Sequence, residues 1–122
     1  YVEFATLGNA TDFGDLDALR TPICGSNSTR GLSIGGGGPG GTNVIQYITM
    51  ATTGNATDFG DTLTATYESG VATSPTRAVF NTGSAVNIEY IQIMTTGNSV
   101  DFGDFSFANY ENQGFSNGHG GL

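Results

Sequence analysis

Six of the eleven acidic residues are aspartates that occur in three pairs with the same spacing. The pairs are Asp12 and Asp15, Asp58 and Asp61, and Asp101 and Asp104. An asparagine stands three residues before each pair, at Asn9, Asn55 and Asn98. Carboxylate and amide oxygens are ligands for Ca²⁺, which takes about six to eight of them. Two interpretations follow, a calcium site at each pair or side chains that accept backbone N–H bonds and cap turns. We favour turn capping and therefore expect no cofactor.

Two further residues carry reactive groups, Cys24 and His119. A cysteine nucleophile requires a base held within hydrogen-bond distance of the thiol. His119 lies among glycines, and nothing in the sequence near Cys24 fixes such a geometry. One cysteine and one histidine also make an internal disulfide impossible and a zinc site improbable. Three equivalent aspartate pairs indicate a structural role, because a catalytic site uses unlike residues at unlike positions. We expect no enzymatic activity.

Four side chains are candidates for binding an external ligand. They are Tyr67, Tyr110, Arg30 and Arg77. The two arginines occupy matching positions in a chain without lysine. Bidentate pairing with an aspartate of the adjacent repeat is the favoured role, and binding of an anion or a sugar is the alternative. The two tyrosines fall in linking segments, where they could stack on a sugar or cover the edge of a sheet.

The aspartate pairs belong to a tandem repeat. Gly-Asn-Ala-Thr-Asp-Phe-Gly-Asp occurs at residues 8–15 and again at 54–61, and Gly-Asn-Ser-Val-Asp-Phe-Gly-Asp occurs at 97–104. A tyrosine precedes each copy by seven residues, at Tyr1, Tyr47 and Tyr90. Periods of this length are typical of propellers, solenoids and other repeat arrays. We predict a single repeat domain over residues 1–122, with units at about 1–46, 47–89 and 90–122.

The segments that must position these residues have the composition of strands. Residues 44–50 and 88–94 are rich in β-branched and aromatic side chains and are bounded by Gly and Asn, and residues 1–6 resemble them. Residues 29–34 and 76–80 form a second set of short apolar segments, with a weaker third version at 112–116. No segment shows helical periodicity. The chain is therefore predicted to be all-β.

Charge and hydropathy exclude two classes of partner. The chain has three basic and eleven acidic residues and a net charge of −8, so it would repel nucleic-acid phosphate. No apolar run approaches the about 20 residues that a membrane-spanning helix needs. We expect neither nucleic-acid binding nor membrane insertion.

The order of these elements resembles the kelch repeat of β-propellers. Residues 32–36 match its apolar strand with a Gly-Gly pair, Tyr47 and Tyr90 match its tyrosine strand, and a Thr-Gly turn follows each tyrosine. The aromatic anchor is taken by Phe13, Phe59 and Phe102 in place of tryptophan. Nearly the whole chain is also similar to kelch-like repeats in structural and tail-fibre proteins of marine bacteriophages, particularly cyanophages. Those repeats carry the same Thr-Thr-Gly-Asn-Ala-Thr-Asp-Phe-Gly-Asp element.

The resemblance implies a propeller-type array of three units, and the blade count implies self-association. The chain begins with the second half of a repeat and ends with the first half of one. Propellers have about four to eight blades, so three blades would leave sheet edges exposed. We expect a homo-oligomer, with a fibre of stacked repeats as the alternative.

The functional expectation also comes from the resemblance. It implies a non-enzymatic structural or attachment module of a virion, at the virion surface or outside the cell, on a tail fibre or surface protein. Its repeated loops would bind host surface polysaccharide. The alternative is a self-assembling extracellular filament or capsid-decoration protein with no external ligand.

Overall fold

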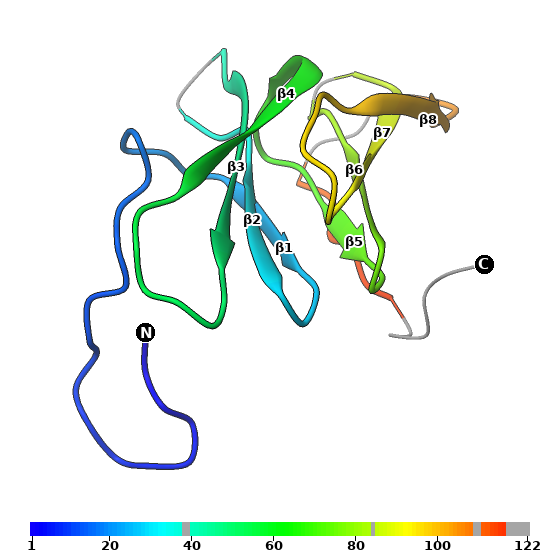
Figure 1. The fold of residues 1–122 in the computed structure, drawn as a ribbon. Coiled ribbons are helices and arrows are strands. Elements are labelled where there is room, and N and C mark those ends of the chain that lie inside the picture. Colours follow the sequence, from blue (N-terminus) through cyan, green and yellow to red (C-terminus); the bar gives the residue numbers. More distant parts are fainter. Residues whose placement is uncertain (38–39, 84, 109–110, 117–122) are drawn as a thin grey trace.

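The protein forms two four-stranded antiparallel sheets that lie side by side (Figure 1). The computed structural model describes residues 1–37, 40–83, 85–108 and 111–116. The prediction of an all-β chain is confirmed. Within the described ranges the chain forms no helix, and so none that is long and apolar enough to cross a membrane.

The two sheets have the same strand order. The first contains β1 (Ile23–Ser26), β2 (Arg30–Ile34), β3 (Thr42–Thr49) and β4 (Thr57–Thr66), in the order β1-β2-β3-β4. The second contains β5 (Val71–Thr73), β6 (Arg77–Asn81), β7 (Asn87–Gln92) and β8 (Val100–Asp104), in the order β5-β6-β7-β8. Each sheet therefore crosses a boundary between the predicted sequence units.

The two sheets also share their register. Tyr47 pairs with Leu32 in the first sheet, and Tyr90 pairs with Val79 in the second. Both have an irregularity between the third and fourth strands, next to Ile45 in one and Ile88 in the other. The same side chains of each repeat are therefore presented at the same place on each sheet.

Four strand predictions are confirmed and three expectations are wrong, one of them the strand expected at residues 1–6, which the structure does not form. The segments at 44–50 and 88–94 correspond to β3 and β7, and those at 29–34 and 76–80 to β2 and β6. The Asp-Phe-Gly-Asp segments at 58–61 and 101–104 were expected in turns but lie in strands β4 and β8. The weaker strand expected at 112–116 is not a strand, and these residues run along β5 instead.

The core lies between the sheets and draws on both of them. Its buried hydrophobic residues are Leu32, Ile34, Ile45 and Phe59 from the first sheet and Ala78, Phe80, Ile91 and Ile93 from the second and its edge. Strands β1 and β5 meet closely, because a Cβ added at Gly25 would lie 2.7 Å from Thr73 Cγ2. The two sheets thus pack against each other, and β4 and β8 are each the edge strand of their own sheet.

Candidate functional site

Each of the first two Asp-Phe-Gly-Asp segments lies against the Gly-Asn turn of the next repeat. At the first contact, the amide of Gly54 donates to the carbonyl of Phe13 at 2.7 Å, and that of Ala56 donates to the carbonyl of Asp15 at 2.9 Å. In the other direction, the Asp15 amide donates to Asn55 Oδ1 at 3.0 Å. We call this arrangement a strand–turn seam.

The second seam repeats the first bond for bond. The Gly97 amide donates to the carbonyl of Phe59 at 2.7 Å, and the Ser99 amide donates to the carbonyl of Asp61 at 2.9 Å. The Asp61 amide donates to Asn98 Oδ1 at 3.0 Å. The near-identity of the repeated octapeptides therefore has a structural reason, since the copy at residues 54–61 forms the turn side of one seam and the strand side of the other.

The glycine inside Asp-Phe-Gly-Asp is required by this close approach. Gly14 and Gly60 have φ angles of 144° and 143°, which side chains rarely tolerate. A Cβ at Gly14 would lie 2.2 Å from the Gly54 carbonyl oxygen, and one at Gly60 would lie 2.5 Å from that of Gly97. The backbone of the turn occupies the space that a side chain would take.

One further backbone amide bond lies behind each seam, and neither of these bonds was predicted from the sequence. The Asp17 amide donates to Gln46 Oε1 at 3.4 Å, and the Leu63 amide donates to Glu89 Oε2 at 3.0 Å. Glu89 is fully buried and also accepts a short hydrogen bond from the Ser99 hydroxyl. The sequence signal for these bonds is a polar residue, Gln46 or Glu89, directly before the repeated tyrosine in an otherwise apolar strand.

The aromatic anchor packs edge-on against the repeated tyrosine in all three copies. The ring centroids are 6.0 Å apart for Tyr1 and Phe13, 6.1 Å for Tyr47 and Phe59, and 6.0 Å for Tyr90 and Phe102. This geometry is favoured by aromatic quadrupoles. It accounts for the fixed spacing between the tyrosine and the Asp-Phe-Gly-Asp segment.

Arg30 connects the two sheets, but not through a carboxylate. Its Nη1 donates to the carbonyl of Ile93 at 2.8 Å, and its guanidinium lies 4.2 Å above the ring of Tyr47. The expected pairing with an Asp-Phe-Gly-Asp carboxylate is not formed. Across the described ranges, the ion pair present joins Arg20 and Asp17 at 2.6 Å.

Arg77 occupies the matching position on the second sheet and is exposed. Its guanidinium lies 5.1 Å above the ring of Tyr90. With the Gln92 amide oriented to satisfy both of its groups, Gln92 Oε1 accepts from Arg77 Nε at 3.2 Å. No third sheet is described beyond Arg77, so it has no counterpart of the bond that Arg30 makes to Ile93.

Five of the six paired aspartates are exposed, Asp61 is half-buried, and the pairs remain separate from one another. In the part of the chain that the structure describes, no three Asp, Glu, His or Cys residues gather into a group that could hold a metal ion. The side-chain oxygens of Asn55 and Asn98, considered above as calcium ligands, accept backbone N–H bonds. Asp101 Oδ1 likewise accepts from the Gly103 amide at 3.2 Å. Asparagines therefore do much of the capping that was assigned to the aspartates.

Of the two tyrosines considered as ligand-binding residues, the structure describes Tyr67. Tyr67 is half-buried in the connection between β4 and β5, and a Cβ at Gly41 would lie 3.0 Å from its ring. One edge of this ring thus covers the glycine-rich turn between β2 and β3. Tyr110 and His119 lie outside the described residues.

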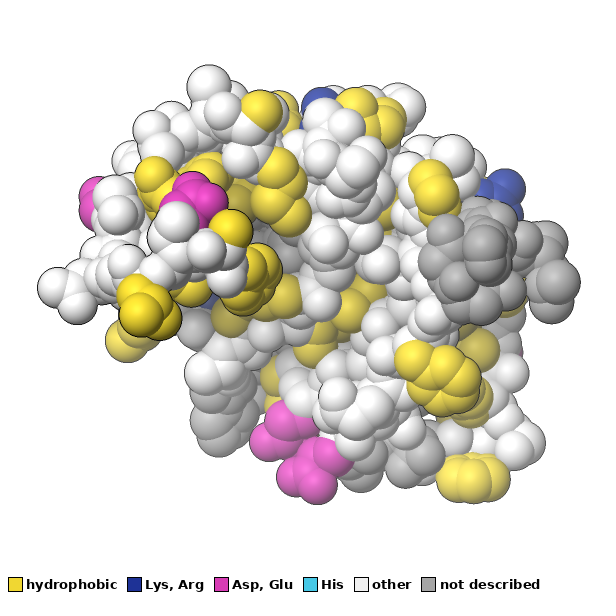
Figure 2. Space-filling view, turned by 90° about the horizontal axis from the view of Figure 1, so that it is seen from below, with side chains coloured by type: hydrophobic (Ala, Val, Ile, Leu, Met, Phe, Trp, Pro, Cys, Tyr) yellow, Lys and Arg dark blue, Asp and Glu magenta, His cyan; other side chains and the backbone are white. Residues whose placement is uncertain are grey.

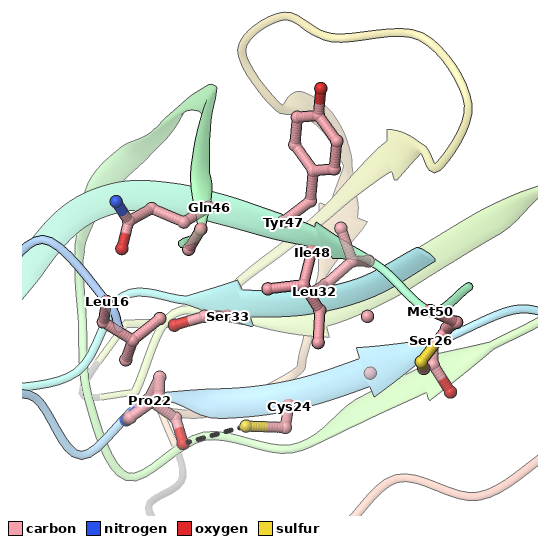
Figure 3. Close-up of a pocket in the computed structure, with 13 residues that line it drawn as sticks. Leu16, Pro22, Cys24, Ser26, Leu32, Ser33, Gln46, Tyr47, Ile48 and Met50 are labelled. Carbon is pink, nitrogen blue, oxygen red and sulfur yellow. Dashed lines mark hydrogen bonds between the residues drawn. The ribbon is translucent and has the colours of Figure 1, made fainter. Parts of the chain in front are cut away.

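A hollow of about 410 Å³ lies on the face of the first sheet that points away from the second. Figure 3 shows its lining, which runs from Pro22 and Cys24 across Leu32 and Ser33 to Ile48. The Cys24 thiol donates to the Pro22 carbonyl at 3.9 Å, and desolvation raises its pKa, although the residue is exposed by surface area. A raised pKa lowers the thiolate fraction, which is the nucleophilic form.

Comparison of the chain with protein-family models gives no match, and comparison with curated proteins gives none either.

Proposed function

We propose that the chain is a non-enzymatic structural and attachment module of a virion, built from kelch-like propeller blades. The observation that carries this proposal is the pair of identical strand–turn seams, which tie each repeat to the next by the same three hydrogen bonds. Such repetition suits a rigid scaffold. The assignment to a virion tail fibre or surface protein rests on the sequence resemblance.

The scaffold would act by holding equivalent loops in a fixed arrangement. Several weak contacts to one repetitive polymer then combine, because the second contact is made at a high effective concentration. Host surface polysaccharide is the proposed target. The exposed Arg77 and the half-buried Tyr67 are the described side chains that we propose contact a sugar, and Tyr110 completes the set from the sequence.

A second candidate function is assembly into a filament or capsid decoration with no external ligand. The exposed apolar side chains favour it, since large apolar patches on soluble proteins mark interaction surfaces. Phe4, Leu7, Leu19, Phe107 and Phe115 are among the most exposed of them. Figure 2 shows hydrophobic side chains in several groups on one face of the molecule, with few Lys or Arg among them.

Binding to immobilised bacterial lipopolysaccharides and capsular polysaccharides, followed by biolayer interferometry, tests the attachment function. We expect saturable binding that Tyr67→Ala and Arg77→Gln weaken, while Leu63→Ala at another exposed site leaves it unchanged. Absence of binding at chain concentrations of about 1 mM, an affinity near −4 kcal/mol, would contradict the attachment function and leave assembly as the candidate.

A further inference from the structure

One strand of the repeat has the geometry of a seam, and within the described ranges no turn lies against it. Gly103 in β8 has a φ of 142°, like the corresponding Gly14 and Gly60. A Cβ at Gly103 would meet nothing within 4 Å, whereas at the other two sites it would strike the backbone of a turn. Phe102 beside it is 55% exposed. Residues 102–104 therefore form an uncovered copy of the strand side of the seam.

The turn side of the seam also has an unused copy. Residues 8–10 have the sequence Gly-Asn-Ala, which is identical to residues 54–56 in the first seam. Among the described residues, the amides of Gly8 and Ala10 and the side chain of Asn9 make none of the seam's hydrogen bonds. Within the described chain this turn lies against no Asp-Phe-Gly-Asp strand. The molecule thus carries one free strand side and one free turn side of the same contact.

The outer face of the first sheet matches a face that is covered elsewhere. In the second sheet, Phe80 pairs with Glu89, and both are buried against the first sheet. The same register positions in the first sheet hold Ser33 and Gln46, which line the 410 Å³ hollow. The hollow on the first sheet is therefore equivalent, by register position, to the face of the second sheet that packs against the first sheet.

Residues 111–116 supply a segment that fits such a surface. They run along β5, since a Cβ at Gly114 would lie 2.0 Å from the Val71 carbonyl oxygen. Ser116 Oγ donates to the Thr73 carbonyl at 2.6 Å. Phe115 in this segment is 92% exposed. The molecule thus has an exposed apolar ring in residues 111–116 and an apolar hollow on the first sheet.

We propose that a second copy of this chain docks head to tail at these surfaces. The turn at residues 8–10 of one copy lies on the strand at residues 102–104 of the other, and Phe115 of the latter enters the hollow of the former. This inference rests on the blade arrangement of the proposed function. A head-to-tail contact closes into a ring where the rotation allows and otherwise extends into a filament.

The new seam would contain the same bonds as the two internal ones. The amides of Gly8 and Ala10 donate to the carbonyls of Phe102 and Asp104, and the Asp104 amide donates to Asn9 Oδ1. Arg77 gains the counterpart of the Arg30 bond, which by repeat position is the carbonyl of Phe4 in the second copy.

The test is the mass of the purified chain in solution across concentrations from about 1 µM to about 1 mM, by sedimentation and light scattering. We expect the mass to rise above the monomer value of 12.5 kDa as concentration increases. Asn9→Ala should weaken this association roughly 2- to 10-fold, the effect of one net hydrogen bond, because Asn9 has no described partner within the chain. Gly103→Ala should weaken it at least about tenfold, because its Cβ would strike the docked turn.

Gly97→Ala is the matched control for Gly103→Ala. Gly97 has a similar φ of 150°, and its Cβ would meet nothing within 4 Å, so it shares the backbone strain without the clash. A chain that stays monomeric throughout, or an association that Asn9→Ala and Gly103→Ala leave unchanged, overturns the proposal. A monomer that binds polysaccharide overturns this inference alone. An oligomer that binds none overturns the attachment function alone.

Discussion

Phe59 and Phe102 belong to the same motif, pack edge-on against equivalent tyrosines, and lie on the fourth strand of equivalent sheets. Phe59 is 2% exposed and Phe102 is 55% exposed. The difference lies outside the motif, because the turn at residues 97–99 and the second sheet cover Phe59. Burial of this motif is therefore supplied by its neighbour, and a repeat is complete only when another repeat follows it.

Truncation of the two phenylalanines should give the largest difference between the covered and the open copy. Phe59→Ala removes a buried ring from the core and should lower the free energy of unfolding by about 3–5 kcal/mol. Phe102→Ala removes a half-exposed ring and should cost less than about 1.5 kcal/mol, since little transfer free energy is lost. Urea denaturation at low micromolar concentration measures both. Equal losses would show that the two copies do not differ in the way described.

The two glycines should separate a clash from backbone strain. Gly60→Ala puts a Cβ 2.5 Å from the Gly97 backbone and should cost about 2–4 kcal/mol from strain and overpacking together. Gly103→Ala in the monomer should cost about 1–2 kcal/mol, because only the strain of positive φ remains. The same denaturation experiment compares them. If Gly103→Ala costs as much as Gly60→Ala in the monomer, the strand at 102–104 is not open.

The two arginines should show a smaller difference of the same kind. Arg30→Ala removes the bond to the Ile93 carbonyl and the stacking on Tyr47, and should lower stability by about 1–2 kcal/mol. Arg77→Ala should change the stability of the monomer by less than about 0.5 kcal/mol, as is usual for exposed sites. Thermal melting resolves the two. A larger loss for Arg77→Ala would contradict the assignment of Arg30 as the link between the sheets.

The smallest expected effect concerns Cys24, which lines the open hollow. Desolvation raises its pKa, so the thiol is more protonated at neutral pH than an ordinary cysteine. Alkylation by iodoacetamide should be slower than that of a free thiol at pH 7.5, and its pH midpoint should lie above the ordinary value. Docking of a second copy should slow it further as concentration rises. A midpoint below the ordinary value would contradict this description of the hollow.

The sequence predicted those parts of the fold in which local pattern and tertiary packing agree. Apolar, β-branched runs indicated β3 and β7 correctly, and of the three phenylalanines expected as anchors between the sheets, Phe59 lies in the core whereas Phe102 is 55% exposed. Strand β8 was missed because Gly and Asp disfavour strands. In β4 the same motif is held in place by bonds from a turn 37 residues away in sequence, as between Asp61 and Asn98. No local pattern contains that information.

The candidate site was predicted less completely for a similar reason. An arginine can donate to a carboxylate or to a carbonyl, so the partner of Arg30 could not be read from residue types. Glu89 stood in an apolar strand, where a charged residue needs partners that only the folded chain supplies. The matching positions of Arg30 and Arg77 were visible in the sequence, but the different surroundings of the two residues were not.

Hydrogen exchange at the amides of Asp61 and Asp104 tests the central claim most directly, because the two residues are equivalent in sequence and differ only in whether a turn covers them. At low micromolar concentration the Asp61 amide, which donates to Asn98, should be protected, and the Asp104 amide should exchange rapidly. As the concentration rises, protection should appear at Asp104 and should be lost again in Asn9→Ala. Protection of Asp104 that is already equal to that of Asp61 at low concentration would contradict the account, as would exchange at Asp104 that stays rapid at every concentration.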